Sequence, residues 1–288
     1  MKVTENIKLA DLTTFGIGSR GVCLYEPQKE SELLELQENL ASDWSRAIYV
    51  GGGSNLLFQD EFLKLPLIRL SGDFGHISKK DNYLQSGAAV PLPRLAARAA
   101  REGLSGLEWA AGIPGSVGGA VVTNAGCFDG MMSDLVEEVK LLNSEGKIEI
   151  RPVAQFDFDY RSSDIKDDEL ILAVKFELKK QKPEEIEKKQ KEFLEKRRRS
   201  QPLEHSSAGC IFKNPADVSA GELIDRAGLK GEKIGGVEVS EKHANFFINR
   251  GGARCADVLR LIERVRRRVF NIFEQKLELE ITVINFNQ

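Results

Sequence analysis

With 288 residues and a net charge of −3, the chain is long enough for two or three subdomains and gives no global reason to bind nucleic acid or an anionic membrane. Its 30% charged and 41% hydrophobic residues are typical of a soluble globular protein. The four cysteines form no C-x-x-C pair and the three histidines lack ligand-like spacing, which argues against a disulfide framework and a metal site. The N-terminal stretch MKVTENIKLADLTTF contains acids and no signal-peptide core, so we expect a cytoplasmic protein.

Alternating strand and helix patterns fill the first hundred or so residues. They predict strands at 22–25 and 47–50, helices at 31–40 and 92–102, and a β-rich stretch at 65–89. Ser31 is expected to cap the first helix. The second strand runs directly into a glycine turn, GGGSN at 51–55.

An uncharged run from Trp109 to Phe128 follows the second helix. It is too apolar for an ordinary loop and too glycine-rich for a packed helix. A membrane span is also not expected, because its glycines and Pro114 would leave helix-breaking backbone exposed in lipid. Closely spaced glycines let backbone N–H groups approach an anion such as a pyrophosphate. The alternative is a buried turn at a domain seam, because glycine marks turns more often than ligands.

The C-terminal half begins with a hairpin and a strand and then becomes strongly charged. Further elements are predicted as a hairpin at 136–150 with its turn at 144–146, a strand at 170–178, an amphipathic helix at 258–273 and a final strand at 277–283. The helix is expected to bury Val258, Leu259, Ile262, Val265, Val269, Phe270 and Phe273. In the final strand, Leu277, Leu279, Ile281 and Val283 share one face and Glu278, Glu280 and Thr282 the other. Residues 179–199 carry ten Lys or Arg against five Glu and read as an exposed linker helix, and 206–254 is rich in glycine and turns.

Standard nucleotide and hydrolase motifs do not explain these glycines. Residues 16–21 match G-x-G-x-x-G, but no convincing strand precedes them and a strand instead of a helix is expected to follow. No G-x-x-x-x-G-K-[ST] occurs, and Pro114 stands where a nucleophile elbow around Ser116 needs glycine. The two glycine turns that remain suit a dinucleotide with a pyrophosphate and a large flat ring. A third cluster, at 207–215, combines a thiol, an amine and an amide, although Cys210 alone is more simply a small buried hydrophobe.

Motifs in order along nearly the whole chain resemble the UDP-N-acetylenolpyruvoylglucosamine reductases. They are GGGSNLL at 51–57, GIPGSVGGAVVTNAG at 112–126, DYRSS at 159–163, SAGCIFKNP at 207–215, LIDRAGLKG at 223–231, VSEKHANFFIN at 239–249 and LELEI at 277–281. The resemblance implies an FAD enzyme of peptidoglycan precursor synthesis that uses NADPH to reduce the enolpyruvyl ether of UDP-N-acetylglucosamine to UDP-N-acetylmuramate.

The resemblance also implies a mixed α+β or α/β fold. An FAD-binding fold of the vanillyl-alcohol-oxidase type would be formed by two α/β subdomains, at 1–72 and at 73–200 with a return strand at 275–288. A third, smaller α/β domain at 201–274 would bind the substrate.

Three residues match the family's catalytic positions. Arg161 lies where the family binds the substrate carboxylate, which a guanidinium fork suits, although a surface ion pair is the simpler alternative. Glu280 matches the catalytic glutamate that orients and polarises the intermediate. The alternative is that Glu280 is an ordinary residue on the solvent-exposed face of the last strand. Cys210 stands where the commonest form has a proton-donating serine. A thiol with a pKa of about 8.5 is mostly protonated at neutral pH and is a competent acid.

Further positions follow from the same motifs. The implied cofactor contacts are Thr14, Phe15, Gly51, Gly52, Gly53, Ser54, Asn55, Gly112, Ile113, Pro114, Gly115, Ser116, Gly118, Gly119, Asn124 and Gly126. Substrate contacts are expected from Arg161, Lys213, Asn214 and Lys230, with His243 and Asn245 as weaker candidates. No tyrosine follows Tyr160, so the substrate-covering tyrosine loop of the longer subtype has no equivalent.

The expected partners are therefore small molecules, with no nucleic acid, no membrane and no metal, and the expected state is a monomer. Two alternatives stay open. One is a flavin oxidase of the same fold, for which Cys127 is the candidate flavin tether. The other is a nucleic-acid-binding protein that uses the basic segment 179–199, a segment that also offers cations to the substrate diphosphate.

Overall fold

The computed structural model describes residues 1–284, so the end of the predicted return strand lies outside the described residues. Two compact units divide the chain. The first comprises Met1–Glu5, Cys23–Gly52 and Leu65–Lys196, and the second comprises Asn6–Val22, Gly53–Lys64 and the chain from Arg197 onward. The three-part division into 1–72, 73–200 and 201–274 stays a prediction.

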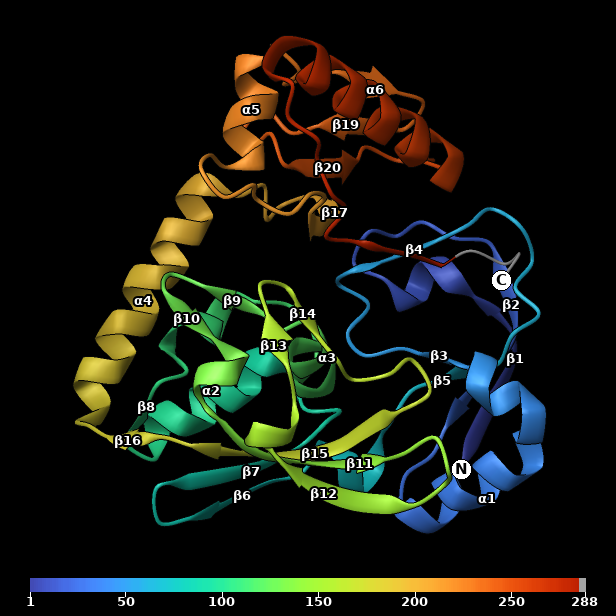
Figure 1. Ribbon diagram of the computed structural model, residues 1–288, viewed down its shortest axis with the longest axis vertical. Coiled ribbons are helices and arrows are strands. Elements are labelled where there is room, and N and C mark those ends of the chain that lie inside the picture. Colours follow the sequence, from blue (N-terminus) through green and yellow to red (C-terminus); the bar gives the residue numbers. More distant parts are fainter. Residues whose placement is uncertain (285–288) are drawn as a thin grey trace. The chain divides into compact units, whose positions relative to one another are not determined.

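The first unit is built around a five-stranded antiparallel sheet (Figure 1). In spatial order its strands are β12 (Ile148–Pro152), β11 (Val136–Leu142), β15 (Leu170–Glu177), β7 (Tyr83–Gly87) and β6 (Ile77–Lys80). Helices α2 (Leu92–Arg101) and α3 (Val117–Val122) contribute to the same core as the sheet. In α2, the leucines and alanines that repeat at helical spacing are buried, and Gly103 (φ +65°) follows the helix.

A smaller parallel arrangement in the first unit leads to the first glycine turn. Strands β2 (Arg20–Glu26) and β3 (Ile48–Tyr49) each pair in parallel with β5 (Leu67–Ile68), beside β1 (Lys2–Lys8). Helix α1 (Glu30–Leu40) packs Leu33 and Leu36 into the core beneath them. Strand β3 ends at Tyr49, so Gly51 and Gly52 emerge at its carboxyl end.

The second unit contains a four-stranded antiparallel sheet. Its order is β17 (Ser206–Cys210), β20 (Phe246–Asn249), β19 (Val237–Val239) and β18 (Lys233–Ile234), and α5 (Ala220–Arg226) and α6 (Cys255–Phe273) share its core. The short β21 (Thr282–Ile284) pairs in parallel with β4 (Leu56–Phe58). Residues 206–254 thus hold a sheet that turn-rich composition did not predict, because its strands are short and pair across distant positions.

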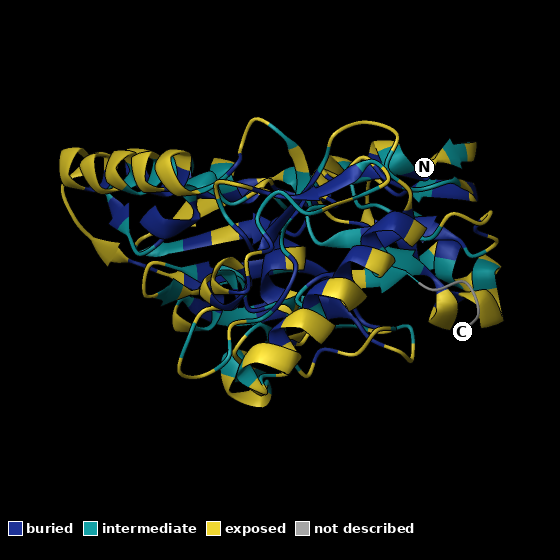
Figure 2. Cartoon of the chain, turned by 90° about the horizontal axis from the view of Figure 1, so that it is seen from above, coloured by how far each residue is buried: buried dark blue, intermediate teal, exposed yellow. Residues whose placement is uncertain are grey.

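Helix α4 (Pro183–Ser200) confirms the predicted exposed helix, and Figure 2 shows it exposed along nearly its whole length. Ile186 and Arg197 are its buried side chains, and Gln190 donates to the carbonyl of Ala96. The helix starts later than expected because Lys179–Lys180 form a strand, β16, that pairs with β8 (Leu104–Ser105). None of the helices within residues 1–284 has the length and apolar character needed to cross a membrane.

Several local predictions need correction. Ser31 does not cap α1, which starts at Glu30; instead the Glu32 carboxylate accepts a hydrogen bond from the Gln28 N–H. The uncharged run does contain a helix, α3, because its glycines pack closely against the sheet: a Cβ at Gly118 would lie 3.0 Å from the Cβ of Ala88. In α6, Phe270 is 45% exposed and Leu261 is buried in its place.

The remaining short strands form hairpins beside α3. They are β9 (Gly126–Cys127) with β10 (Gly130–Met131), and β13 (Phe158–Asp159) with β14 (Ser162–Ser163). The predicted 136–150 hairpin is confirmed as β11 and β12, whose turn is held by the side chain of Asn143.

We predict that the second unit loses stability in acid through Glu238. This carboxylate is 3% exposed and accepts two 3.0 Å hydrogen bonds from Arg250, which lower its pKa together with Lys233. A lowered folded pKa means that the stabilisation is present above the ordinary value and is lost as pH falls through the folded value. Glu238→Gln should therefore cost about 1.5 to 3 kcal/mol at neutral pH.

The measurement is urea unfolding of the two proteins at pH 7 and at successively lower pH. The difference between wild type and Glu238→Gln should shrink as pH falls below the normal glutamate range. A difference that stays constant would contradict this role for Glu238.

Candidate active site

The two predicted glycine turns touch each other in the first unit. An ideal Cβ on Gly52 would lie 2.6 Å from the Cα of Gly115, and one on Gly51 would lie 2.3 Å from the Oγ of Ser116. Because the clash at Gly52 is with backbone atoms, only hydrogen fits at that position. Backbone hydrogen bonds hold the second glycine turn against the β7–α2 connection. The Leu92 N–H donates to the Gly115 carbonyl, and the Val117 N–H donates to the Val90 carbonyl.

This contact leaves backbone donors available for a ligand. Among the hydrogen bonds within residues 1–284, none is donated by the N–H of Gly51, Gly52 or Gly115. Converging N–H groups in glycine turns form a concave binding site for an anion. The donors and the absence of side chains fit a pyrophosphate, so these turns suit a dinucleotide cofactor.

The rest of the first glycine turn lies in the second unit, together with the predicted cofactor residues Thr14 and Phe15. Gly53 has φ +64°, and a Cβ there would lie 1.8 Å from the carbonyl oxygen of Leu12. The Thr14 N–H donates to the Gly53 carbonyl, and the Thr14 hydroxyl donates to the Ser207 carbonyl. Phe15 is fully buried, and its carbonyl accepts from Asn249. Asn55 donates from Nδ2 to the Glu280 carbonyl, which ties this turn to the last strand.

Arg161 lies in the tight turn of the β13–β14 hairpin, with φ +57°. Its Nη2 donates to the Gly126 carbonyl over 2.6 Å, and its guanidinium lies 5.1 Å from the Tyr160 ring centroid. A non-glycine residue in the left-handed region carries local strain, which is frequent at functional sites. The structure therefore places the predicted carboxylate-binding arginine directly beside the uncharged run.

Cys210 follows a β-bulge in β17. The register of β17 against β20 shifts between Ser207 and Cys210, and Gly209 has φ +75° with open space around it. A bulge with a left-handed glycine redirects the side chain that follows, and such bulges are common beside active sites. Cys210 is half-buried at this point.

Glu280 lies on the backbone that pairs with the segment after Cys210. Its N–H donates to the Ile211 carbonyl, and the Lys213 N–H donates to the Glu278 carbonyl. The second unit thus brings Cys210, Lys213 and Glu280 onto two neighbouring stretches of chain. The predicted alternation of the last strand is present: Leu277 and Ile281 are buried, although regular β21 begins only at Thr282.

Comparison with known proteins connects these features. The protein-family model described as "UDP-N-acetylenolpyruvoylglucosamine reductase, C-terminal domain" matches residues 201–284. A second family model, "FAD binding domain", matches residues 23–150. The curated UDP-N-acetylenolpyruvoylglucosamine reductase of Carboxydothermus hydrogenoformans is 41% identical over 98% of this chain and 94% of its own length. That of Bacillus subtilis is 36% identical over 100% of this chain and 95% of its own.

A solved structure matches nearly the whole chain. The crystal structure of UDP-N-acetylenolpyruvylglucosamine reductase from Thermus caldophilus superposes with a TM-score of 0.86 at 38% identity, covering 99% of this chain and 100% of that one. The chain belongs to the UDP-N-acetylenolpyruvoylglucosamine reductase family. The expected fold class, a mixed fold with an FAD-binding domain, is confirmed.

The structure changes the reading of some residues predicted from the reductase family. Asn214 accepts from the N–H of Ala220, the first residue of α5, and Lys230 pairs with Asp225 at 2.6 Å, so each already has a partner within the protein. Burial lowers the pKa of His243, whose Nδ1 has no hydrogen-bond partner within the described residues. The substrate contacts of Lys213, Asn214 and Lys230 stay predictions.

Asn245 has a structural role that the sequence did not reveal. Its side chain is 1% exposed, donates to the Phe212 carbonyl and accepts from the Phe212 N–H. Both ends of the amide are thus engaged within the protein, and the substrate contact expected of this side chain stays a prediction. Asn245 fixes the segment that follows Cys210.

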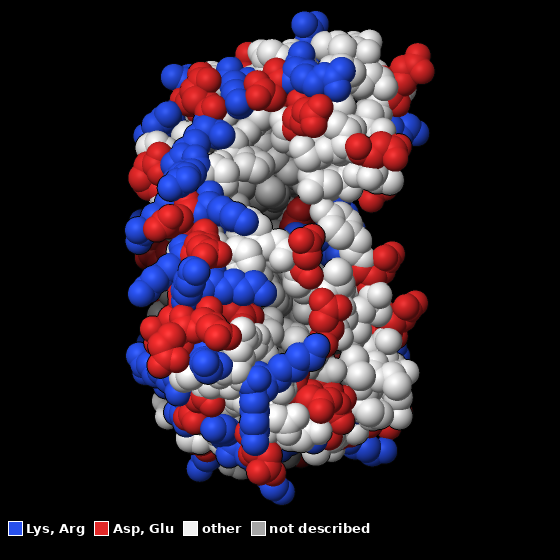
Figure 3. Space-filling view, turned by 90° about the vertical axis from the view of Figure 1, so that its left-hand side faces the viewer, with Lys and Arg blue, Asp and Glu red and all other residues white. Residues whose placement is uncertain are grey.

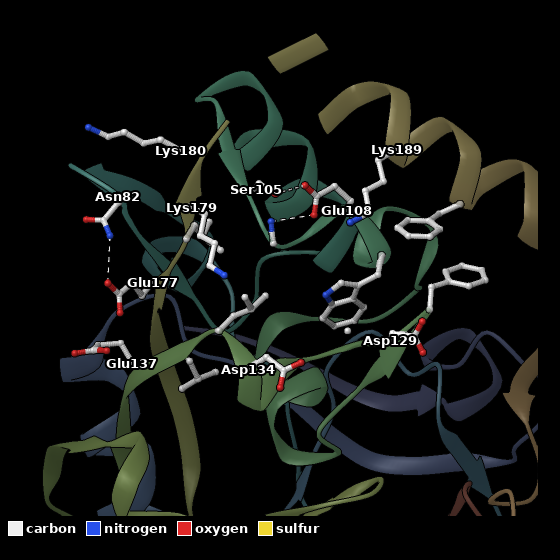
Figure 4. Close-up of a pocket in the computed structure, with 18 residues that line it drawn as sticks. Asn82, Ser105, Glu108, Asp129, Asp134, Glu137, Glu177, Lys179, Lys180 and Lys189 are labelled. Atoms are coloured by element: carbon white, nitrogen blue, oxygen red, sulfur yellow. Dashed lines mark hydrogen bonds between the residues drawn. The ribbon is translucent and has the colours of Figure 1, made fainter. Parts of the chain in front are cut away.

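A separate cavity of about 920 Å³ opens in the first unit (Figure 4). Trp109, Phe128 and Phe193 form its apolar wall, and none of the predicted site residues is among those that line it. Lys179, Lys180 and Lys189 reach it together with several carboxylates, including Glu137 and Glu177. Along the side that carries α4, acidic side chains interrupt the basic ones (Figure 3), a pattern that does not favour a phosphate-tracking surface.

We predict that Gly52→Ala removes most of the bound flavin. Its Cβ would need the Gly115 backbone to move from 2.6 Å, which separates the two turns and costs about 1 to 3 kcal/mol. The measurement is flavin per chain after gel filtration, together with Tm. Gly75→Ala is the matched control, because nothing lies within 4 Å of a Cβ there. Full flavin content in Gly52→Ala would contradict the proposed role of the contact.

Proposed function

We propose that the protein is an NADPH-dependent flavoenzyme that reduces the enolpyruvyl ether of UDP-N-acetylglucosamine to the lactyl ether of UDP-N-acetylmuramate, a step in peptidoglycan precursor synthesis. The observation that carries this proposal is the end-to-end structural match to a solved reductase, at a TM-score of 0.86. The contact between the glycine turns supports it independently, because backbone N–H groups in such turns are suited to a cofactor pyrophosphate.

Residues Gly51, Gly52 and Gly115 would hold the FAD pyrophosphate by their N–H groups. When bound there, FAD would supply the redox chemistry, the transfer of a hydride from NADPH to one alkene carbon of the enolpyruvyl group. The other alkene carbon must receive a proton, so the reaction converts one NADPH and one proton into NADP⁺ and two new C–H bonds. The protein therefore needs a proton donor and a group that stabilises negative charge.

Arg161 is suited to the substrate carboxylate. Its charge is permanent, and the planar guanidinium matches a carboxylate by paired hydrogen bonds. As the hydride arrives, negative charge spreads into the carboxylate as an enolate, and a fixed cation stabilises it more in the transition state than in the substrate. The bond to the Gly126 carbonyl holds the arginine in place before substrate binds.

Cys210 would donate the proton. Its thiol gives a proton to the second alkene carbon, and the thiolate is then reprotonated from solvent. The bulge at Gly209 supports this role because it turns the side chain out of the regular strand alternation. Glu280, on the neighbouring backbone, would orient and polarise the intermediate.

The oxidase alternative is not favoured. Its candidate flavin tether, Cys127, donates its thiol hydrogen to the Trp109 carbonyl at 3.3 Å. We further propose that the enzyme acts in the cytoplasm as a monomer on small-molecule substrates. Analytical ultracentrifugation of the flavin-loaded protein tests the monomer.

Product identification tests the function directly. The purified protein is incubated with NADPH and the enolpyruvyl sugar nucleotide, and the product is identified by mass spectrometry. We expect NADPH consumption that depends on the sugar nucleotide, and a product with two more hydrogen atoms. NADPH oxidation at the same rate without the sugar nucleotide would contradict the proposal.

Variants of Cys210 separate the two halves of the reaction. Cys210→Ser should keep substantial activity because a hydroxyl can also donate the proton, whereas Cys210→Ala should lower turnover by about a hundredfold or more. Both should still be reduced by NADPH at the wild-type rate, measured as anaerobic loss of flavin absorbance. Full turnover by Cys210→Ala would exclude Cys210 as the proton donor.

A further inference from the structure

Asn124 lies two residues beyond the end of helix α3, in a conformation that normally selects glycine. Its φ is +40°, its N–H donates to the Val121 carbonyl, and the next N–H, from Ala125, donates to the Ala120 carbonyl. This pair of bonds is the Schellman motif, in which the left-handed residue after the helix is usually glycine. Asparagine tolerates the position at some cost, so its side chain is expected to contribute something that glycine lacks.

The side chain of Asn124 is wholly engaged within the first unit. It is 2% exposed, and Nδ2 donates to the Asp159 carbonyl at 3.0 Å while Oδ1 accepts from the Ser133 N–H at 3.0 Å. Both ends of the amide are therefore occupied by protein atoms. The predicted cofactor contact of Asn124 stays a prediction.

The bond to Asp159 is one of the hydrogen bonds that join the uncharged run to the β13–β14 hairpin, as are two from Ser163 and Arg161. The Ser163 hydroxyl donates to the Val122 carbonyl at 2.7 Å, and Arg161 Nη2 donates to the Gly126 carbonyl at 2.6 Å. Alternate residues of the run thus bind alternate positions of the hairpin. Asn124 supplies the only one of these three bonds that uses a side chain of the run.

Asp159 is the last residue of β13, directly before the two-residue loop that contains Arg161. It pairs with Ser162 across a loop of only Tyr160 and Arg161, so a displacement of the Asp159 carbonyl moves the arginine backbone. Arg161 itself has left-handed φ, and such a conformation persists only where the surroundings fix it.

We infer that Asn124 is a positioning residue for Arg161: its amide fixes the hairpin so that the guanidinium is already placed for the substrate carboxylate. This inference rests on the proposed function, in which Arg161 binds that carboxylate. Asn124 need not touch the substrate, and its effect passes through the Asp159 carbonyl.

The variant Asn124→Gly isolates the side chain, because glycine favours the left-handed backbone and preserves the Schellman motif. Reduction by NADPH is the internal reference and should change much less than reoxidation. Reoxidation of the reduced enzyme by the enolpyruvyl sugar nucleotide should slow by about tenfold to a hundredfold, the effect of a small misplacement of a catalytic group. UDP-N-acetylmuramate should also bind the oxidised holoenzyme more weakly, measured by calorimetry.

A second variant and a double-mutant cycle exclude a purely structural effect. Asn124→Asp keeps an acceptor for Ser133 but loses the donor to Asp159, so it should slow reoxidation as Asn124→Gly does. In an Arg161→Ala background, Asn124→Gly should have little further effect, because both changes remove the same interaction. An equal slowing in both backgrounds would overturn the inference.

Asn143→Ala is the matched control. Asn143 is also a buried asparagine, and its Oδ1 accepts from the N–H groups of Glu145 and Lys147 in the β11–β12 turn. This variant should lower Tm without slowing reoxidation. Wild-type reoxidation in Asn124→Gly would overturn the inference, whereas failure of the wild-type enzyme to be reoxidised would instead overturn the proposed function.

Discussion

Two glycine turns pack so closely that no side chain fits between them at Gly52, and the first unit depends on this contact. Gly51 and Gly52 leave β3 and contact Gly115 and Ser116 directly. A Cβ on Gly52 would push the turn after the parallel strands away from the backbone of Gly115. The same closeness gathers backbone donors that suit an anion, so packing and the predicted cofactor binding would depend on the same residues.

The uncharged run serves a second purpose at its far end. After Ser116 the run forms helix α3. Asn124 and Gly126 follow the helix, and the Gly126 carbonyl accepts a hydrogen bond from Arg161. One stretch of chain therefore connects the predicted pyrophosphate site to the arginine proposed to stabilise the intermediate. Charges are absent from it because it packs on the sheet at one end and offers backbone groups at the other.

How far the sequence predicts the structure depends on the range of the interactions. Helices α2 and α6 follow from local spacing of apolar residues, and their positions are confirmed. Family motifs indicate Arg161, Cys210 and Glu280, but no local pattern reveals the bulge before Cys210 or the buried amide of Asn245. The partner of Asn124 lies 35 residues away, a separation at which periodicity carries no information.

Anaerobic single turnover of the wild-type protein tests the central claim most directly. Stoichiometric NADPH should bleach the flavin, and the enolpyruvyl sugar nucleotide added afterwards should restore its absorbance and yield one equivalent of UDP-N-acetylmuramate. Flavin that stays reduced after that addition, but is reoxidised when oxygen is admitted, would contradict the account.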